Sequence, residues 1–195
     1  MTRSAPAPAG SRARFEGLYR ADPDPWATAT SPYEREKFAR TLQAAGSGPL
    51  GDVLELGCGV GTFTELLVPR ARRVIAVDFS ITAVGHARRR LAEHVLVEVA
   101  TAQLPEEQPA GPFEAIFACE LLYYWDPPVV ADAARRMVEA LRPGGQLICA
   151  TWRGTADDLR MDAAAAHGIV AAQAGLRRTG TDLQPGYQLD HFLRP

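Results

Sequence analysis

From Asp52 onward, short apolar runs rich in β-branched residues alternate with longer segments that carry arginine and glutamate on one face. This alternation is typical of strand–helix–strand units, and it predicts a parallel sheet covered by helices on both faces. We expect strands at 53–56, 74–78, 95–99, 113–119 and 146–151, with helices at 63–69, 82–93 and 129–141. A chain of 195 residues has room for one such domain.

The segments on either side of this core have simpler signals. Residues 156–175 read as an alanine-rich helix, and 176–181 and 187–193 read as two terminal strands joined by a turn at 184–186. Pro143-Gly144-Gly145 predicts the turn that leads into the fifth strand. In the leader, 15–45, prolines at 23 and 25 exclude regular helix, whereas Ser31 can cap a helix from Pro32. We expect the leader to cover the ligand crevice, and residues 1–14 to form a disordered tail.

A glycine loop, ELGCGVG at 55–61, follows the first strand and opens a helix. Such a loop points backbone N–H groups at a ligand and lets it approach closely. A phosphate-binding loop needs Gly-Lys-Ser/Thr at its end, whereas Thr62 follows Gly61 here. The alternating glycines also differ from the dinucleotide fingerprint, and Glu55 would repel a pyrophosphate. The loop therefore favours a ligand with a cationic amino group.

Asp78 ends the second expected strand. In a doubly wound sheet the first two strands are neighbours, so their carboxyl ends lie side by side. A carboxylate is an acceptor that reaches two donors at once, which suits the two hydroxyls of a ribose. Taken alone, Asp78 has a solvated strand end as its alternative; beside the glycine loop, it indicates a ribose-bearing ligand.

Four stretches in this order resemble the class I S-adenosylmethionine (SAM)-dependent methyltransferases: VLELGCGVG at 53–61, AVDFS at 76–80, FEAIF at 113–117 and LRPGG at 141–145. Three further runs look like the nodulation protein S group: LYRADPDPW at 18–26, SPYER at 31–35 and ELLYY at 120–124. The resemblance implies a doubly wound α/β sheet of seven strands, six parallel and one antiparallel. It implies SAM as cofactor and S-adenosylhomocysteine (SAH) as product. That group methylates the free amine of a deacetylated chitooligosaccharide, which implies an amine acceptor, such as an amine on a sugar.

The cofactor site that we expect combines the glycine loop, the ends of the second to fourth strands and the leader. Many of these enzymes place an acidic residue after the third strand for the adenine amine, but ATAQ at 100–103 offers none. Thr101, Gln103 or the backbone around Ala102 would then serve, while Tyr33 or Lys37 would lie near the methionine carboxylate. The expected cofactor-binding residues are Trp26, Tyr33, Lys37, Glu55, Gly57, Cys58, Gly59, Gly61, Thr62, Asp78, Phe79, Ser80, Thr101, Ala102, Gln103 and Glu120.

The acceptor is expected at the switch in strand order, between the first and fourth strands. The fourth strand delivers Glu120, Tyr123 and Tyr124 to that edge, and these are the candidate catalytic residues. Glu120 would hold the incoming ammonium or accept its proton, and the tyrosines would line the amine or stack on a sugar. The alternatives are a carboxylate that caps a neighbouring amide and aromatic rings that only pack. Methyl transfer chiefly needs alignment, desolvation and a deprotonated nucleophile.

Several classes compete with an N-methyltransferase. An O-methyltransferase would need a base for a hydroxyl, for which His167, His191 and Glu120 are candidates. A SAM- or SAH-binding regulator without catalysis fits the same cofactor motifs, whereas the glycine spacing disfavours an NAD-dependent oxidoreductase.

The net charge of −2 and the three widely spaced cysteines bear on the partners and the cellular location of the protein. The charge gives no sign of a nucleic-acid or membrane partner, and the cysteines fit neither a disulfide framework nor a metal site. We expect a small-molecule acceptor, a cytoplasmic location and a monomer or homodimer.

Overall fold

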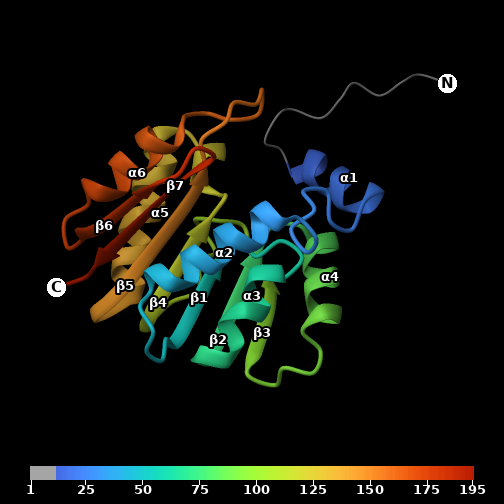
Figure 1. Cartoon of the computed structure of the whole chain (residues 1–195), viewed down its shortest axis with the longest axis horizontal. Coiled ribbons are helices and arrows are strands. Elements are labelled where there is room, and N and C mark those ends of the chain that lie inside the picture. Colours follow the sequence, from blue (N-terminus) through green and yellow to red (C-terminus); the bar gives the residue numbers. More distant parts are fainter. Residues whose placement is uncertain (1–11) are drawn as a thin grey trace.

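Seven strands form one sheet in the order β3-β2-β1-β4-β5-β7-β6 in the computed structural model, which describes residues 12–195 (Figure 1). β7 runs antiparallel to β5 and β6, and the other neighbouring pairs are parallel. The predicted doubly wound sheet, with six strands parallel and one antiparallel, is confirmed. The strands are β1 (Gly51–Leu56), β2 (Ala71–Asp78), β3 (Val97–Thr101), β4 (Phe113–Cys119), β5 (Leu141–Trp152), β6 (Arg177–Leu183) and β7 (Tyr187–Leu193).

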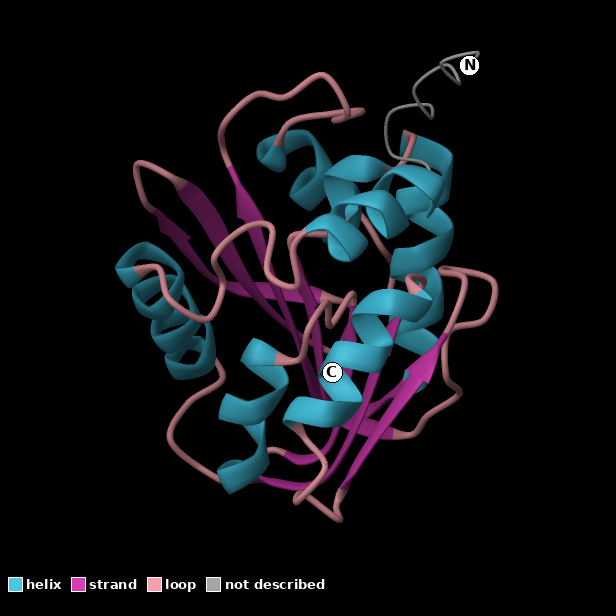
Figure 2. Cartoon of the chain, turned by 90° about the vertical axis from the view of Figure 1, so that its right-hand side faces the viewer, coloured by secondary structure: helices cyan, strands magenta, loops and turns pink. Residues whose placement is uncertain are grey.

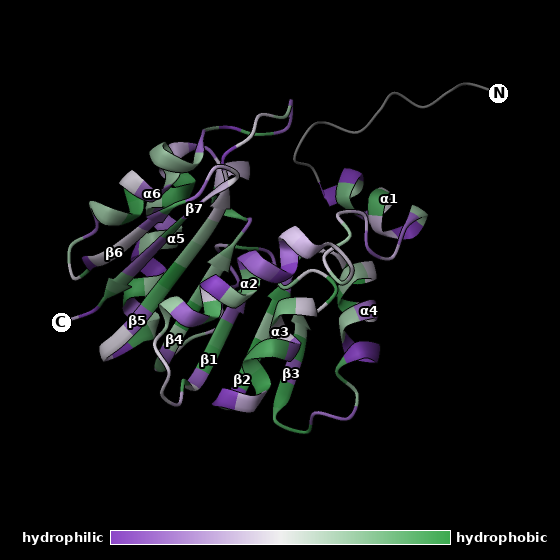
Figure 3. Cartoon of the chain, in the orientation of Figure 1, coloured by the Kyte–Doolittle hydropathy of each residue, from purple (hydrophilic) through white to green (hydrophobic). Residues whose placement is uncertain are grey.

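Helices cover both faces of the sheet, as the side view shows (Figure 2). The face formed by Leu54, Ile116 and Leu147 packs against α5 (Pro127–Ala140) and α6 (Ala163–Ala171). The opposite face packs against α2 (Pro32–Ala44), α3 (Thr62–Leu67) and α4 (Ile81–Arg90). Most residues of the central strands are hydrophobic (Figure 3), as expected for strands buried on both sides, and Glu55 of β1 is a charged exception. Within the described residues, no helix is long and apolar enough to cross a membrane.

The switch in strand order lies where it was expected, because β1 pairs with β2 on one side and with β4 on the other. Leu56, the last residue of β1, lies beside Val77 of β2 and Ala118 of β4. The loops that follow these three strands therefore open at the same edge of the sheet. This edge is where an open α/β sheet binds its ligands.

Several boundaries differ from the prediction by a few residues, and three of the differences change how a segment is interpreted. β5 begins at Leu141 and not at 146, because Phe113 pairs with Leu141 and the residues up to 145 form an irregularity within the strand instead of a separate turn. α6 begins only after Asp162, whose Oδ1 accepts the N–H of Ala165 at 2.8 Å, so 156–162 is loop and not helix. Residues 12–14 belong to α1 (Arg12–Ala21) and not to the predicted tail, the rest of which lies outside the described residues.

The leader packs as two helices on the edge where the ligand crevice was expected (Figure 1). Ser31 caps α2 as predicted, since its hydroxyl accepts the N–H of Glu34 at 3.4 Å. Glu16 of α1 accepts the N–H of Ile81 at 2.6 Å and the hydroxyl of Thr82 at 2.6 Å. A carboxylate at this position satisfies the free amides of the first turn of α4. The leader is thus attached to the helix that follows β2.

Candidate functional site

A cavity of about 830 Å³ lies between the carboxyl ends of the central strands and the leader. This volume is in the upper part of the range of small-molecule sites, about 300–1,000 Å³. Fourteen of the predicted site residues line it, although they come from distant parts of the sequence. These residues are Trp26, Tyr33, Lys37, Glu55, Gly57, Cys58, Gly59, Thr62, Asp78, Phe79, Gln103, Glu120, Tyr123 and Tyr124.

Four predicted site residues do not line the cavity: Gly61, Ser80, Thr101 and Ala102. Gly61 has a φ of +79°, and a Cβ there would lie 3.0 Å from the side chain of Leu91, so this glycine serves the packing of α4. Ser80 caps α4 through the N–H of Ala83 at 3.1 Å. The N–H of Ala102 donates to the carbonyl of Asp78 at 3.0 Å, which joins the ends of β2 and β3. These residues do not face the cavity, but their contacts hold the elements that form its walls.

Two buried carboxyl groups face the cavity, Glu55 at the end of β1 and Asp78 at the end of β2; they are 3% and 6% exposed. Asp78 Oδ2 accepts the N–H of Gly59 at 2.9 Å, and Oδ1 accepts the N–H of Ser80 at 2.9 Å. Asp78 therefore fixes the glycine loop against the second strand. Each of its oxygens accepts one of these bonds and retains a second lone pair for a ligand hydroxyl.

Glu55 is the unusual member of the pair, because its buried Oε2 has no hydrogen-bond partner within the described residues. Burial and, to a smaller extent, the charge of Asp78 together raise the pKa of Glu55 to about 8. Burial also raises the pKa of Asp78 to about 6, although the N–H groups of Ser80 and Gly59 oppose the rise. A buried carboxyl without a partner is costly unless a ligand satisfies it. The site thus suits a ligand that brings a cation to Glu55 and hydroxyl groups to Asp78.

Aromatic rings from the leader close the cavity above Phe79. The ring of Phe15 lies 5.3 Å from that of Phe79 and 5.1 Å from that of Tyr124, and Tyr19 lies 5.4 Å from Trp26. Phe15 and Tyr19 are cavity residues that the sequence analysis missed, because their contacts join segments far apart in the chain. They are four residues apart, and this helical spacing was the available signal.

The leader loop is shaped by Asp24, a further cavity residue that was not predicted. Its carboxylate accepts the N–H groups of Thr28 and Ala29, each at 2.8 Å. Thr28 then bonds Thr62 at the start of α3, with 3.0 Å between the hydroxyl oxygens. Aspartate often organises turns in this way, so the Asp-Pro-Asp-Pro run carried the signal for this loop.

Glu120 lies on the acceptor side of the cavity in an ion cluster. Its Oε1 is 2.7 Å from Nζ of Lys37, and Lys37 also contacts Glu34 at 2.9 Å. The hydroxyl of Tyr123 donates to Glu120 Oε2 at 2.6 Å. The cluster of Glu34, Lys37 and Glu120 therefore holds two carboxylates against one ammonium, and this side of the cavity attracts cations.

The loop between β5 and α6 forms the mouth of the cavity through Ala156, Asp158 and Leu159. Arg14 of α1 contacts Asp158 at 3.3 Å, and the N–H of Arg160 donates to the carbonyl of Tyr123 at 2.8 Å. The leader and this loop thus meet across the mouth. The sequence analysis missed this wall because it expected helix here.

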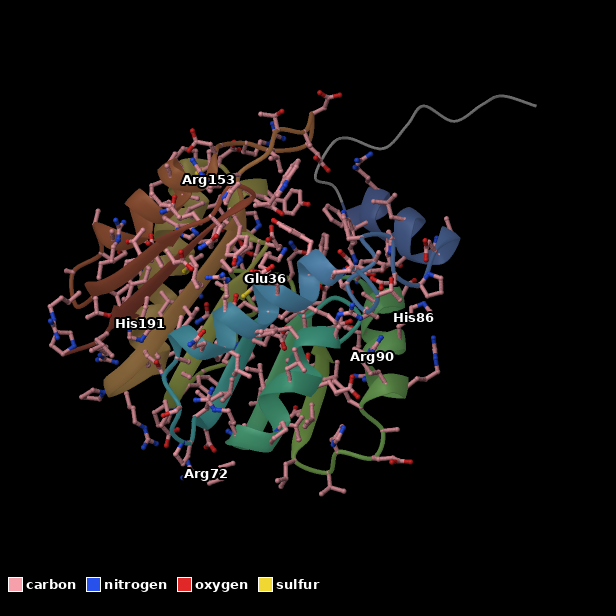
Figure 4. The ribbon with its side chains drawn as sticks, viewed as in Figure 1. Glu36, Arg72, His86, Arg90, Arg153 and His191 are labelled. Atoms are coloured by element: carbon pink, nitrogen blue, oxygen red, sulfur yellow. The ribbon has the colours of Figure 1, made fainter. Side chains whose placement is uncertain are left out.

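The histidines that were candidate bases are not cavity residues. His167 is fully buried, with Nδ1 2.9 Å from Asp190 Oδ2 and Nε2 2.8 Å from the hydroxyl of Thr151. His191 lies on β7, on the opposite side of the molecule from His86 of α4, for which no chemical role is expected (Figure 4). Within the described residues, Glu120 is the one candidate base of the three that reaches the cavity.

Comparison with known proteins gives one matching family model and several methyltransferase relatives. The family of nodulation protein S (NodS) matches residues 13–178. Nodulation protein S of Rhizobium tropici is 31% identical over 127 residues, which are 64% of this chain and 53% of the relative. Trans-aconitate 2-methyltransferase of Azoarcus sp. is 39% identical over 119 residues, 58% of this chain and 44% of the relative. The chain spans about half the length of these curated relatives.

Among solved structures, the N-methyltransferase NodS from Bradyrhizobium japonicum WM9, in complex with SAH, is similar with a TM-score of 0.82. It is 27% identical in sequence, and the match covers 93% of this chain and 98% of that chain.

Proposed function

Since the chain belongs to the nodulation protein S family, we propose that it transfers a methyl group from SAM to an amine. The observation that carries the methyltransferase proposal is the pair of buried carboxyl groups on the cavity, Glu55 and Asp78. The orphaned oxygen of Glu55 fits the ammonium of the methionine part of SAM. The free lone pairs of Asp78 fit the ribose hydroxyls. The residues on the cavity thus fit the cofactor that the family implies.

When bound, SAM would supply an electrophilic methyl group on a sulfonium. The acceptor ammonium would first lose a proton to Glu120 or to solvent, and the lone pair of the neutral amine would then form the new C–N bond as the C–S bond breaks and SAH leaves. The chain contributes binding, orientation and exclusion of water. The glycine loop lines the cavity through Gly57 and Gly59, and the rings of Phe15, Trp26 and Phe79 cover it. Closing such a site strengthens the electrostatic interactions inside it, and alignment lowers the barrier further.

The charge of the ion cluster supports an amine as acceptor. Glu34 and Glu120 outnumber Lys37, so a cationic acceptor is attracted and an anionic one is repelled. Trans-aconitate, the substrate named for the Azoarcus relative, carries carboxylates and suits this cluster poorly. The N-methyltransferase NodS structure supports the same choice. A sugar amine is the favoured acceptor because Tyr123, Tyr124 and Trp125 supply aromatic surface beside Glu120.

The proposal is tested with methyl-labelled SAM and a panel of acceptors. We expect label to be transferred to amines, with D-glucosamine, chitosan oligomers and ethanolamine in the panel. The matched controls are N-acetyl-D-glucosamine, which lacks the free amine, and trans-aconitate. Transfer to either control but to none of the amines would establish an O-methyltransferase instead. If calorimetry shows SAH binding but no member of the panel is methylated, the result would support the alternative of a regulator that binds SAM or SAH without catalysis.

We also expect SAH to bind more tightly as the pH rises. Without ligand, Glu55 is neutral below its pKa of about 8. An ammonium beside it stabilises the carboxylate and lowers this pKa, so binding releases a proton. The acids that surround Glu55 are Asp78, Cys58 and Cys119.

The measurement is the Kd of SAH by calorimetry between about pH 6.5 and 8, where the Kd should fall by up to about ten-fold per pH unit. Glu55→Gln keeps the size of the side chain but cannot ionise, so its Kd should stay flat. If the Kd of SAH changes with pH equally in wild type and in Glu55→Gln, the proton released on binding comes from another group, in Asp78 or in the ligand.

A further inference from the structure

Lys37 is a buried cation with partners already in place. Its side chain is 3% exposed, and its Nζ lies 2.7 Å from Glu120 Oε1 and 2.9 Å from the carboxylate of Glu34. Burial lowers the pKa of Lys37, but the charges of Glu120 and Glu34 outweigh burial and raise the pKa above its usual value. Lys37 is therefore charged at neutral pH. A cofactor carboxylate would have to compete with two carboxylates for this one ammonium.

Glu120 is held from three elements at once. Lys37 of α2 binds Oε1, while Oε2 accepts the hydroxyl of Tyr123 at 2.6 Å and the N–H of Trp152, at the end of β5, at 3.0 Å. The backbone of Glu120 has a φ of +52°, in the left-handed region that is unfavourable for a residue other than glycine. Such a conformation persists only where the surroundings impose it. These contacts fix both the backbone and the carboxylate.

The fixed carboxylate keeps one open position toward the cavity. Oε2 has two donors, whereas Oε1 has one, the ammonium of Lys37, within the described part of the chain. A carboxylate oxygen accepts two hydrogen bonds. The side chain of Glu120 is 26% exposed and lines the cavity, so Oε1 is within reach of a ligand. An acceptor ammonium has a preformed partner there.

We infer that Lys37 is a positioning residue for the acceptor, which fixes Glu120 for the acceptor ammonium and does not bind the cofactor carboxylate. This inference rests on the proposed function, because it needs an amine as acceptor. It departs from the sequence-based expectation, which placed Lys37 at the methionine carboxylate of the cofactor.

The test separates the cofactor from the acceptor by measuring the Kd of SAH and the KM and kcat for D-glucosamine. In Lys37→Met, the KM for D-glucosamine should rise by about ten-fold or more, because a buried charge pair loses one partner. The Kd of SAH should stay within about two-fold of wild type. Arg40→Met is the matched control, since it removes a cation from the same helix at an exposed site that pairs with Glu36. It should change neither constant.

A double-mutant cycle shows whether Lys37 acts through Glu120. In a Glu120→Gln background, Lys37→Met should raise the KM no further, because the group that it positions is already changed. If the effects of the two substitutions on the KM multiply instead, Lys37 has a merely structural role. If Lys37→Met does not fold, Tyr123→Phe removes another donor to the same carboxylate and enters the same cycle.

Other outcomes overturn the inference or the function separately. A Kd of SAH weakened about ten-fold in Lys37→Met, with an unchanged KM, would make Lys37 a cofactor ligand. If wild type binds SAH but methylates no amine, the amine proposal fails, and the inference fails with it. If wild type binds neither SAM nor SAH, the methyltransferase proposal itself fails.

Discussion

Replacing Asp78 with alanine is expected to weaken the binding of SAH by at least about 100-fold. Each hydrogen bond to a charged group contributes about 1.5–3 kcal/mol, and the variant loses two to the ribose. It also loses the acceptor for the N–H of Gly59, so the glycine loop is no longer fixed against β2. Calorimetry with SAH measures the effect, and circular dichroism checks that the sheet is retained.

The control for this prediction is Asp132→Ala. Asp132 lies on α5, where it pairs with Arg135 and Arg136 at the surface and does not line the cavity. Its removal should leave the Kd of SAH unchanged. If Asp78→Ala bound SAH as tightly as the control, the ribose would not lie at the end of β2.

Replacing Asp190 with alanine is expected to lower the free energy of unfolding by about 3–5 kcal/mol, since a buried pair loses one partner. Asp190 is fully buried and accepts from His167 at 2.9 Å and from Gln188 at 3.0 Å. For a chain of this size, such a loss lowers the Tm by roughly 10 °C. Urea unfolding gives the free energy, and a thermal scan gives the Tm.

The pH dependence of this contribution has a definite sign. Burial raises the pKa of Asp190, but the hydrogen bond from His167 and its neighbours outweigh burial and lower the pKa below its usual value. Because its pKa is lowered in the folded state, Asp190 stabilises the protein at pH values above its pKa in the unfolded chain, about 3.9. This stabilisation is lost as the pH falls below that value. The difference in the free energy of unfolding between wild type and Asp190→Ala should therefore become smaller at acidic pH.

Asp182→Ala is the matched control, because Asp182 lies on the neighbouring strand β6 with 39% of its side chain exposed. Surface substitutions of this kind change stability by about 0.5 kcal/mol or less. A similar small loss in Asp190→Ala would mean that His167 finds another partner when the carboxylate is removed.

The sheet was predictable because its signals are local. Alternating apolar runs marked the strands, and Asp78 stood at the end of a strand whose position followed from the glycine loop before it. The cap of α2 at Ser31 was visible for the same reason. Residue type and spacing determine these features within a few positions of the chain.

The side of the cavity that the leader and Glu120 form was predictable only in part, because the contacts there join distant segments of the chain. No local pattern shows that Glu16 binds the start of α4 or that Lys37 meets Glu120. The left-handed backbone of Glu120 results from donors on three elements, which only the folded chain brings together. The cap at Asp162 was available in the sequence, but the long alanine-rich run obscured it.

The floor of the cavity and its cover come from separate stretches of the chain. The glycine loop, Glu55 and Asp78 belong to the sheet, whereas Phe15, Tyr19 and Trp26 belong to the leader that precedes it. The leader is joined to the remainder both by polar contacts, such as that of Glu16 with the first turn of α4, and by the packing of Phe38 on Phe63. Substitutions in the leader can therefore change the cover of the cavity while the two carboxyl groups of its floor stay in place in the sheet.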